Sequence, residues 1–313
     1  MVQPWRCEMP VTKKRQLNSN FTVDRNIKIG NLLYSILCKN GAGMDSLENF
    51  YTAEDCSRRP ADCRIEVIDH KSRANNDRAQ IRSNKLFEAD QTWGIYRGKK
   101  AGINGGTIMT VPALKKGSRS RVFAEFDCDF RNGTVYTGRA EEHYFFYPFL
   151  EVLTINLLAR GKGSLLHACC IDDNGVGYLF LGQSGAGKST MANLWNEEEG
   201  ITVLSDDRVL VSTTAKGITA HGTPWHGTEK YAVNASVPVN KIFFINHAEK
   251  NSVLKLSGIK AASELIKNAF LPFWDKNRME YSTEFLVQLS QKARLFSLGV
   301  YPDRGIIDLV RNI

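Results

Sequence analysis

Hydrophobic and polar residues alternate with two different periods along this chain. In the first part, short segments alternate at every second residue and end in turns such as Asn104-Gly105-Gly106, a pattern typical of strands. The strands predicted in this way cover residues 64–68, 92–96, 106–111, 121–126 and 133–137. We therefore expect a first lobe of α+β or mostly β structure, in which no catalytic group of residues is visible.

Longer apolar runs begin about halfway along the chain. An apolar helix opened by Pro148 is predicted over residues 145–158, followed by a buried strand over 164–171. The turn Asp173-Asn174-Gly175 is a strong hairpin signal. The strand at 164–171 should therefore run antiparallel to the next apolar strand, which covers residues 176–181.

The rest of the chain alternates between helix and strand patterns. The helix after residue 189 is expected to end at Glu199-Gly200, where the glycine can take a positive φ. Strands are predicted over 201–204, 241–245 and 294–300, and helices over 258–269, near 283–292 and at the C-terminus. The predicted fold is an α/β domain with a mixed sheet in residues 145–313, preceded by a smaller α+β lobe in residues 1–144 that is a candidate for substrate or partner recognition.

Composition narrows the protein class. The 313 residues are 42% hydrophobic and 24% charged, as in ordinary globular proteins. No apolar run reaches the ~18 residues of a membrane span, and the N-terminus is polar and basic, which predicts a cytoplasmic protein that does not contact a membrane.

Of the net charge of +8, residues 1–150 carry +7 (24 Lys and Arg against 17 Asp and Glu), which suits an acidic peptide or protein partner. No nucleic-acid-binding motif is visible, and the basic cluster at residues 115–121 is interpreted as a solvated loop.

The seven cysteines are scattered and lack C-x-x-C spacing. Reduced thiols are the favoured interpretation, with a metal or disulfide pair of Cys56 and Cys63 as the alternative. Cys169 and Cys170 lie within an apolar run and are expected to be buried small hydrophobic residues.

One segment fits the phosphate-binding loop pattern G-x-x-x-x-G-K-[ST], also called Walker A, at every fixed position. It reads Gly182-Gln183-Ser184-Gly185-Ala186-Gly187-Lys188-Ser189 and continues into a helical pattern at Thr190. An apolar strand precedes it, so the strand–loop–helix context is present as well. In such a loop, backbone N–H groups surround the phosphates, Lys188 reaches the β- and γ-phosphates, and the Ser189 hydroxyl can bind Mg²⁺. The segment predicts binding of a nucleoside triphosphate.

A second polar group follows 18 residues after Lys188. The strand at 201–204 ends in Ser205-Asp206-Asp207, and a carboxylate is needed near the Mg²⁺ of a phosphate-binding loop. Two adjacent carboxylates suggest that one positions the metal while the other accepts a proton from an attacking hydroxyl. The alternative is a solvated turn between strands.

Histidines supply further candidates. His167 lies in the strand that should pair beside the strand entering the phosphate-binding loop. It is either a hydrogen-bonded core histidine or a group near the γ-phosphate. A Gly- and Pro-rich segment with His221, His226 and Lys230 is either a loop that closes over a substrate or a surface turn.

The order of these elements resembles the catalytic domain of bacterial HPr serine kinases, a family of phosphoenolpyruvate carboxykinase-like P-loop kinases. The resemblance is most specific over residues 144–212 and does not extend to residues 1–140. It implies a phosphoenolpyruvate carboxykinase-like P-loop domain. It also implies that Lys188 and the loop amides hold ATP, that Ser189 binds Mg²⁺, and that Asp206 is the general base for an acceptor serine. Asp207 would be its partner near the metal, and His167 would face the phosphates.

Two features depart from that family. Its glycine-rich signature with a Glu-Ile-Arg core, downstream of the paired aspartates, is replaced here by Gly222-Thr223-Pro224-Trp225-His226-Gly227. This segment is more similar to divergent HPr-kinase-related proteins, some of which modify peptides. The N-terminal domain of true HPr kinases is also not recognisable, so HPr is not expected to be the substrate.

The sequence therefore favours a kinase that uses ATP and Mg²⁺ to phosphorylate a hydroxyl, and the acceptor that it favours is a serine in a peptide or protein. Two alternatives stay open: a kinase for a small-molecule alcohol, and a nucleotide-dependent regulatory module without phosphotransfer. The acceptor, the oligomeric state, reverse phosphorolysis and the roles of His221, His226 and Lys230 are not decided by the sequence.

Overall fold

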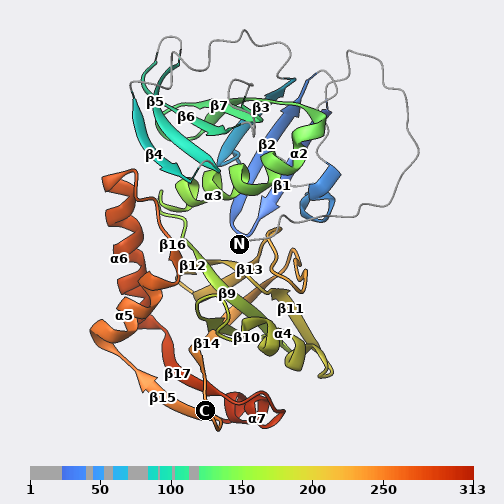
Figure 1. Cartoon of the computed structure of the whole chain (residues 1–313), viewed down its shortest axis with the longest axis vertical. Helices are drawn as coiled ribbons and strands as arrows, with labels where there is room; N and C mark the ends of the chain where they lie inside the picture. Colours follow the sequence, from blue (N-terminus) through green and yellow to red (C-terminus); the bar gives the residue numbers. More distant parts are fainter. Residues whose placement is uncertain are drawn as a thin grey trace, which may run out of the picture.

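A computed structural model describes residues 23–39, 45–52, 59–69, 84–90, 92–100, 103–112 and 120–313. Within these residues the chain forms two mixed β-sheets, one above the other in Figure 1, with helices beside and between them. The predicted α/β class is thereby confirmed. Residues 1–20, the basic residues 115–119, Cys7 and Cys56 lie outside the described residues.

The first sheet has eight strands among the described residues, in the order β1-β2-β3-β8-β7-β6-β5-β4. Pairing is parallel from β2 to β3 and from β3 to β8, and antiparallel elsewhere. The strands are β1 (Val23–Ile29), β2 (Leu32–Cys38), β3 (Cys63–Ile68), β4 (Lys85–Ala89), β5 (Trp93–Lys100), β6 (Ile103–Val111), β7 (Val122–Phe126) and β8 (Asn132–Thr137), with a 3-10 helix η1 (Asp45–Phe50) after β2.

Between the sheets the chain is helical. Short turns η3 (Arg139–Glu141) and α2 (Glu142–Tyr144) lead into an irregular turn η4 (Phe145–Phe149) and then into α3 (Leu150–Leu158). The predicted helix over 145–158 is therefore regular only from Leu150, because Tyr147 has extended backbone angles before Pro148.

The second sheet is built around β9 (Ser164–Asp173). Its remaining strands are β10 (Val176–Leu181), β11 (Ile201–Ser205), β12 (Arg208–Thr214), β13 (Gly217–Gly222), β14 (Ser236–His247), β15 (Ser252–Leu256), β16 (Ala269–Phe270) and β17 (Arg294–Val300). The helices are α4 (Lys188–Asn196), α5 (Gly258–Lys267), α6 (Lys276–Lys292) and α7 (Gly305–Asn312). β10 runs antiparallel to β9 and parallel to β14, which is parallel to β17.

The predicted hairpin is confirmed. β9 and β10 pair antiparallel through the turn at Asn174 and Gly175, both of which have positive φ, as a two-residue hairpin turn requires. β9 continues past the end of this hairpin and pairs on its other edge with β11 and then with β12. This long strand therefore connects the phosphate-binding loop on one edge with the paired aspartates on the other.

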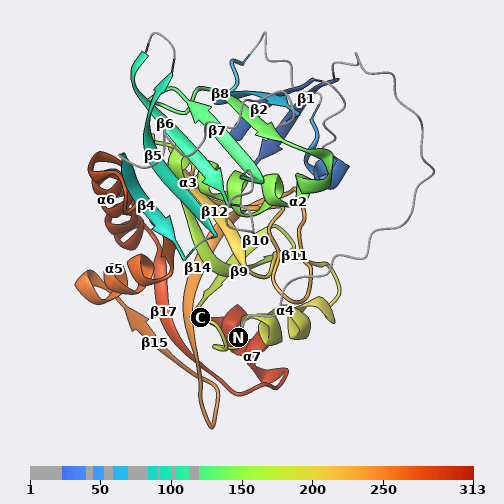
Figure 2. The same cartoon turned by 45° about the horizontal axis from the view of Figure 1, so that its top comes forward.

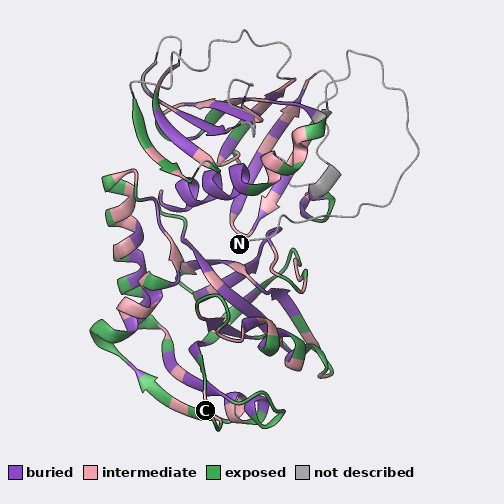
Figure 3. Ribbon diagram, viewed as in Figure 1, coloured by how far each residue is buried: buried purple, intermediate pink, exposed green. Residues whose placement is uncertain are grey.

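The core is shared between the two sheets. All nine residues of α3 are buried (Figure 3). The helix shares one hydrophobic core cluster with residues of the first sheet, with Leu165 of β9 and with Leu210 of β12. Figures 1 and 2 show α3 against the face of the first sheet that is directed toward β9. The lobe boundary proposed near residue 145 therefore falls in a segment that contributes to a common core.

Several predicted bounds differ from the structure. α4 ends at Asn196 rather than at Glu199, and Gly200 keeps a positive φ in the following turn, beside the Asn174 side chain. α6 begins seven residues earlier than the predicted Thr283, because the Asp275 carboxylate accepts a hydrogen bond from the Arg278 amide and caps the helix. Among the described residues, no helix is both long and apolar enough to span a membrane.

Candidate active site

The phosphate-binding loop connects β10 to α4. Gly185 and Gly187 have φ values of +83° and +104°, which residues with a side chain rarely adopt. Gly187 is the residue before the first turn of α4, so the loop leads directly into the N-terminus of this helix. The predicted loop between a strand and a helix is thus present, and glycines stand at its two positions of positive φ.

Lys188 is buried and turned back into this loop. Its Nζ donates hydrogen bonds to the carbonyl oxygens of Gly182 (2.6 Å) and Gln183 (3.1 Å). Burial, with a smaller contribution from the charge of Arg208, lowers the pKa of Lys188 to about 8, although Cys169 and Asp206 act in the opposite direction. A polyphosphate beside this ammonium would replace the solvation that burial removes, so the site fits an anionic ligand.

A cavity of about 400 Å³ lies against the first part of the loop. Its walls are formed by Gly182–Ala186, by the end of β14 from Phe244 to His247, and by Glu264, Lys267 and Asn268 at the end of α5. His247 Nε2 lies 2.7 Å from the Gly185 carbonyl oxygen and fixes this wall to the loop. The volume is in the range of small-molecule sites.

The paired aspartates lie in a tight turn between β11 and β12. The Ser205 hydroxyl donates to the Arg208 carbonyl oxygen (2.8 Å) and accepts from the Arg208 amide (3.2 Å). This local bonding holds the two aspartates in different directions. The turn is not solvated as the alternative interpretation supposed, since Asp206 is 2% exposed.

Asp206 holds the segment that follows β13. Its Oδ1 accepts from the Gly227 amide (2.7 Å) and its Oδ2 from the Glu229 amide (2.9 Å). A Cβ at Gly227 would lie 2.6 Å from Asp206 Oδ2, so only glycine allows this close approach. A carboxylate has about four lone-pair sites, so Asp206 keeps acceptor capacity beyond these two bonds.

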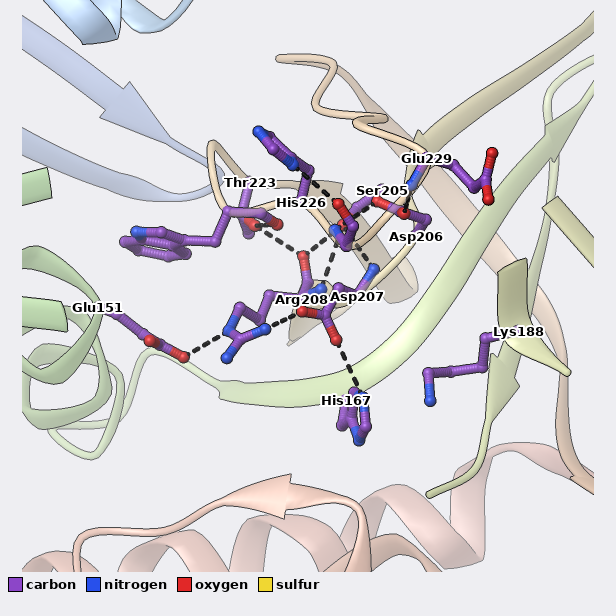
Figure 4. Close-up of polar contacts among 12 residues, drawn as sticks. Glu151, His167, Lys188, Ser205, Asp206, Asp207, Arg208, Thr223, His226 and Glu229 are labelled. Carbon is purple, nitrogen blue, oxygen red and sulfur yellow. Dashed lines mark hydrogen bonds and ion pairs between the residues drawn. The ribbon is translucent and has the colours of Figure 1, made fainter. Parts of the chain in front are cut away.

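Asp207 lies at the centre of a chain of polar contacts (Figure 4). Its Oδ1 lies 2.9 Å from His167 Nε2, and its Oδ2 accepts from the Arg208 guanidinium. Arg208 Nε also donates to Glu151 Oε1 of α3 at 2.6 Å. Burial raises the pKa of Glu151, and the charge of Arg208 acts against that rise. The four side chains form a continuous series from α3 to His167.

The environment of His167 fixes its protonation. Burial lowers the pKa of His167 to about 4, and the positive charges of Lys188 and Arg208 contribute to the shift. The imidazole is therefore neutral near pH 7, and its contact with Asp207 is a hydrogen bond rather than an ion pair. Because a carboxylate only accepts, Nε2 carries the proton and Nδ1 keeps its lone pair.

Strand register explains why these groups meet. Leu181, the last residue of β10, pairs with Ala168 of β9. His167 precedes Ala168 in β9 and pairs with Arg208 of β12 on the opposite edge of that strand. The start of the phosphate-binding loop, His167 and the aspartate turn are therefore adjacent in the sheet. Figure 4 shows the Lys188 ammonium directed toward the His167–Asp207 pair.

Two residues of these segments carry oxygen donors of the kind that Mg²⁺ prefers. Ser189, in the first turn of α4, offers a hydroxyl, and Asp207 offers a carboxylate. Mg²⁺ in phosphotransfer sites commonly takes one or two protein oxygens together with phosphate oxygens and water. Among the described residues, no three His, Cys, Asp or Glu side chains gather to hold a metal by themselves.

The segment with His221 and His226 is fixed in place. His221 is in β13, buried between the hydroxyls of Ser212 and Ser236, and does not join the site. The Trp225 indole donates to the Phe146 carbonyl oxygen at 3.0 Å, and Asp206 holds the two amides named above. These hydrogen bonds attach the segment to Phe146 and to Asp206, whereas a loop that closes over a substrate would have few such contacts. Lys230 is exposed.

Two residues of the polar chain were not anticipated from the sequence. Glu151 is the single acidic residue of an otherwise apolar stretch, Phe149-Leu150-Glu151-Val152-Leu153, and such isolation was the available signal. Arg208 directly follows the two aspartates, and a cation there can pair with either of them.

Comparisons with known proteins give limited information. The family described as SynChlorMet cassette protein ScmC matches residues 149–297, just under half of the chain. This chain is similar to that family over the segment that carries the site. A search of curated proteins found no match.

One solved structure that matches is the Hpr(Ser) kinase/phosphatase from Coxiella burnetii. It is 12% identical to this chain, with a TM-score of 0.30, and the match covers 47% of this chain and 86% of that one. A TM-score of this size supports no inference about the fold or function of this chain. The site geometry therefore has to support the functional assignment.

Proposed function

We propose that this protein is a kinase that transfers the γ-phosphoryl group of ATP to a hydroxyl, in a reaction that requires Mg²⁺. The acceptor we propose is the serine side chain of a peptide or protein. The second domain would then be a phosphoenolpyruvate carboxykinase-like P-loop domain of the HPr serine kinase type. The observation that carries the proposal is the adjacency of the phosphate-binding loop, His167 and the Asp206–Asp207 turn on the edges of β9.

The proposed roles follow the chemistry of phosphoryl transfer, which depends on positioning and charge stabilisation. The amides of residues 182–190 and Lys188 would bind the phosphates, and Lys188 would stabilise negative charge on the transferred group. Ser189 and Asp207 would hold Mg²⁺, which supplies further charge stabilisation on the phosphate oxygens.

Proton removal from the acceptor is the role that needs a carboxylate or imidazole. We propose Asp206 as the general base, with His167 facing the phosphates beside it. The hydrogen bonds from the Gly227 and Glu229 amides orient the Asp206 carboxylate, and its remaining lone pairs can accept a proton. A module that only bound nucleotide would need no general base beside the phosphate-binding loop.

A serine acceptor in a peptide or protein is supported by charge. Residues 1–150 carry most of the positive charge of the chain, which favours an acidic partner that approaches from the first lobe. A small-molecule alcohol is the second candidate, and the 400 Å³ cavity at the loop supports it, because its volume suits a metabolite.

Label transfer from γ-labelled ATP tests the proposal. Wild type, Lys188→Ala, Asp206→Asn and Asp207→Asn would each be incubated with Mg²⁺ and with lysate of the host, split into protein and small-molecule fractions. We expect label in the protein fraction with wild type and a loss of roughly 100-fold or more with Asp206→Asn, the size expected for a general base. ATP binding, measured by titration, should persist in Asp206→Asn and weaken strongly in Lys188→Ala.

The outcomes separate the candidates. Label that appears only in the small-molecule fraction would favour the alcohol kinase. Label transfer that survives Asp206→Asn but not Asp207→Asn would move the base role away from Asp206. Tight ATP binding without any transfer by wild type would favour a regulatory module and contradict the kinase proposal.

A further inference from the structure

Glu151 is an acidic residue buried inside an apolar helix. Every residue of α3 is buried, and the Glu151 side chain is only 6% exposed. A carboxylate in such a place is costly unless a cation pairs with it. Its partner is Arg208, whose Nε lies 2.6 Å from Glu151 Oε1.

Arg208 is held from several sides at once. Its guanidinium contacts Glu151 at one position and Asp207 at another, so the planar group is fixed by two carboxylates. The rings of Tyr147 and Phe270 lie 5.5 and 5.1 Å from its Cζ atom. With these contacts the guanidinium has one favoured orientation, and Asp207 is oriented with it.

Asp207 in turn orients His167. Oδ2 of Asp207 accepts a hydrogen bond from the Arg208 guanidinium. The other oxygen, Oδ1, is therefore the one that accepts from His167 Nε2, at 2.9 Å. The direction of this bond sets the ring orientation and the tautomer of His167, as carboxylates do for histidines in other polar sites. A shift of Arg208 would therefore be transmitted to the imidazole beside Lys188.

We propose that Glu151 is a positioning residue for the site, which acts through Arg208 and Asp207 to fix the orientation and tautomer of His167. Because α3 also packs on the first sheet, this chain of contacts makes the site geometry depend on the packing of α3 between the two sheets. The rate part of this inference rests on the proposed kinase function, whereas the effect on His167 does not.

The test uses the full-length protein and two variants of Glu151. Glu151→Gln keeps the shape of the side chain and removes its charge, and Glu151→Leu removes the hydrogen-bond acceptor as well. The matched control is Glu197→Gln, which removes a carboxylate from the exposed pair with Arg304. The first readout is the imidazole nitrogen spectrum of His167 by NMR, assigned with a His167→Gln variant.

In wild type we expect the His167 signal of a neutral ring protonated at Nε2, with slow exchange of that proton. Glu151→Leu should broaden this signal or mix the tautomers, Glu151→Gln should do so less, and Glu197→Gln should leave it unchanged. An unchanged His167 spectrum in both Glu151 variants would overturn the proposal. If Glu151→Leu does not fold, the charge-only Glu151→Gln variant still decides.

The second readout is turnover of MgATP with water as the acceptor, so that no unidentified substrate is needed. We expect kcat to fall roughly 10- to 100-fold in Glu151→Leu, the range found when supporting residues of a site are lost, with the KM for ATP within about twofold. A KM that rises while kcat is unchanged would overturn the positioning role. Absence of turnover in wild type would count against the proposed function alone, since the His167 spectrum decides the present inference independently.

Discussion

At the scale of single residues, the two adjacent aspartates differ in what surrounds them. Asp206 is bonded to backbone amides of the Gly227–Glu229 segment, whereas Asp207 is bonded to the side chains of His167 and Arg208. The sequence predicted two roles for the pair because phosphoryl transfer to a hydroxyl needs both a metal ligand and a proton acceptor. It could not tell that the segment after β13 would return to Asp206, since that contact joins residues 21 positions apart.

Two neutral histidines, the partly buried His167 and the buried His221, make the stability of the protein depend on pH. Burial lowers the pKa of His167 and of His221 to about 4, below the ordinary 6.5. Between pH 6.5 and 4 the unfolded chain binds more protons than the folded one, so stability falls as the pH falls through this range. Each histidine contributes up to about 3 kcal/mol of this loss, at about 1.4 kcal/mol for each pKa unit.

Urea unfolding at pH 7.5 and pH 5 measures this effect. We expect the unfolding midpoint of wild type to drop between the two pH values, and His221→Gln to show a smaller drop. His221 is suited to this test because it lies between Ser212 and Ser236, away from the proposed chemistry. An identical drop in wild type and His221→Gln would contradict the buried neutral state.

At the scale of elements, the C-terminal helix α7 depends on a buried lysine of β14. Lys241 Nζ donates to the carbonyl oxygens of Val310 (2.7 Å) and Arg311 (3.2 Å) in the last turn of α7. Burial lowers the pKa of Lys241, as does the charge of Arg294. The final carbonyl groups of a helix have no partner within the helix, and a cation there is stabilising.

Lys241→Met should therefore loosen α7 while keeping most of the apolar packing. We expect the free energy of unfolding to fall by about 1–3 kcal/mol, the usual effect of leaving buried acceptors without a partner. Hydrogen exchange should increase over Gly305–Asn312 in particular. Unchanged exchange there, in a variant of unchanged stability, would show that the lysine does not hold the helix.

The sequence predicted elements well where their signals are local. The β9–β10 hairpin, the phosphate-binding loop and β17 follow from a turn, a motif and an apolar run within a few residues of each other. β12, β13 and β15 were not predicted, and β14 was predicted at under half its length. β14 begins with Ser236 to Asn240, where exposed and buried positions mix, and its pairing with β13 and, at Val239, with β10 makes that part a strand.

The series of polar contacts from Glu151 to His167 shows that local sequence patterns have the same limit in predicting the site. Lys188 and the aspartates were chosen from motifs and His167 from its predicted strand, and the register of β9 brings His167 beside the aspartate turn. Glu151 lies 57 positions before Arg208, and only the packing of α3 against β9 and β12 makes them neighbours. Contacts of this range depend on the whole fold and leave little trace in the local pattern.

At the scale of the whole molecule, the two sheets are joined through α3 and its side-chain bonds. Tyr34 of the first sheet bonds to Thr154 of α3 at 2.7 Å, and the Trp274 indole, before α6, donates to Asn156 of α3 at 3.0 Å. The first lobe is thus attached to the helix that also carries Glu151.

The most direct test of the central claim is mass spectrometry of the phosphate acceptor. The full-length protein would be incubated with MgATP and peptides from its own host, with Lys188→Ala as the matched control. The proposed kinase predicts peptides that carry one added phosphoryl group on a serine side chain with wild type and none with Lys188→Ala. If titration shows that wild type is saturated with MgATP and no peptide gains a phosphoryl group, the proposal that this protein is a serine kinase is contradicted.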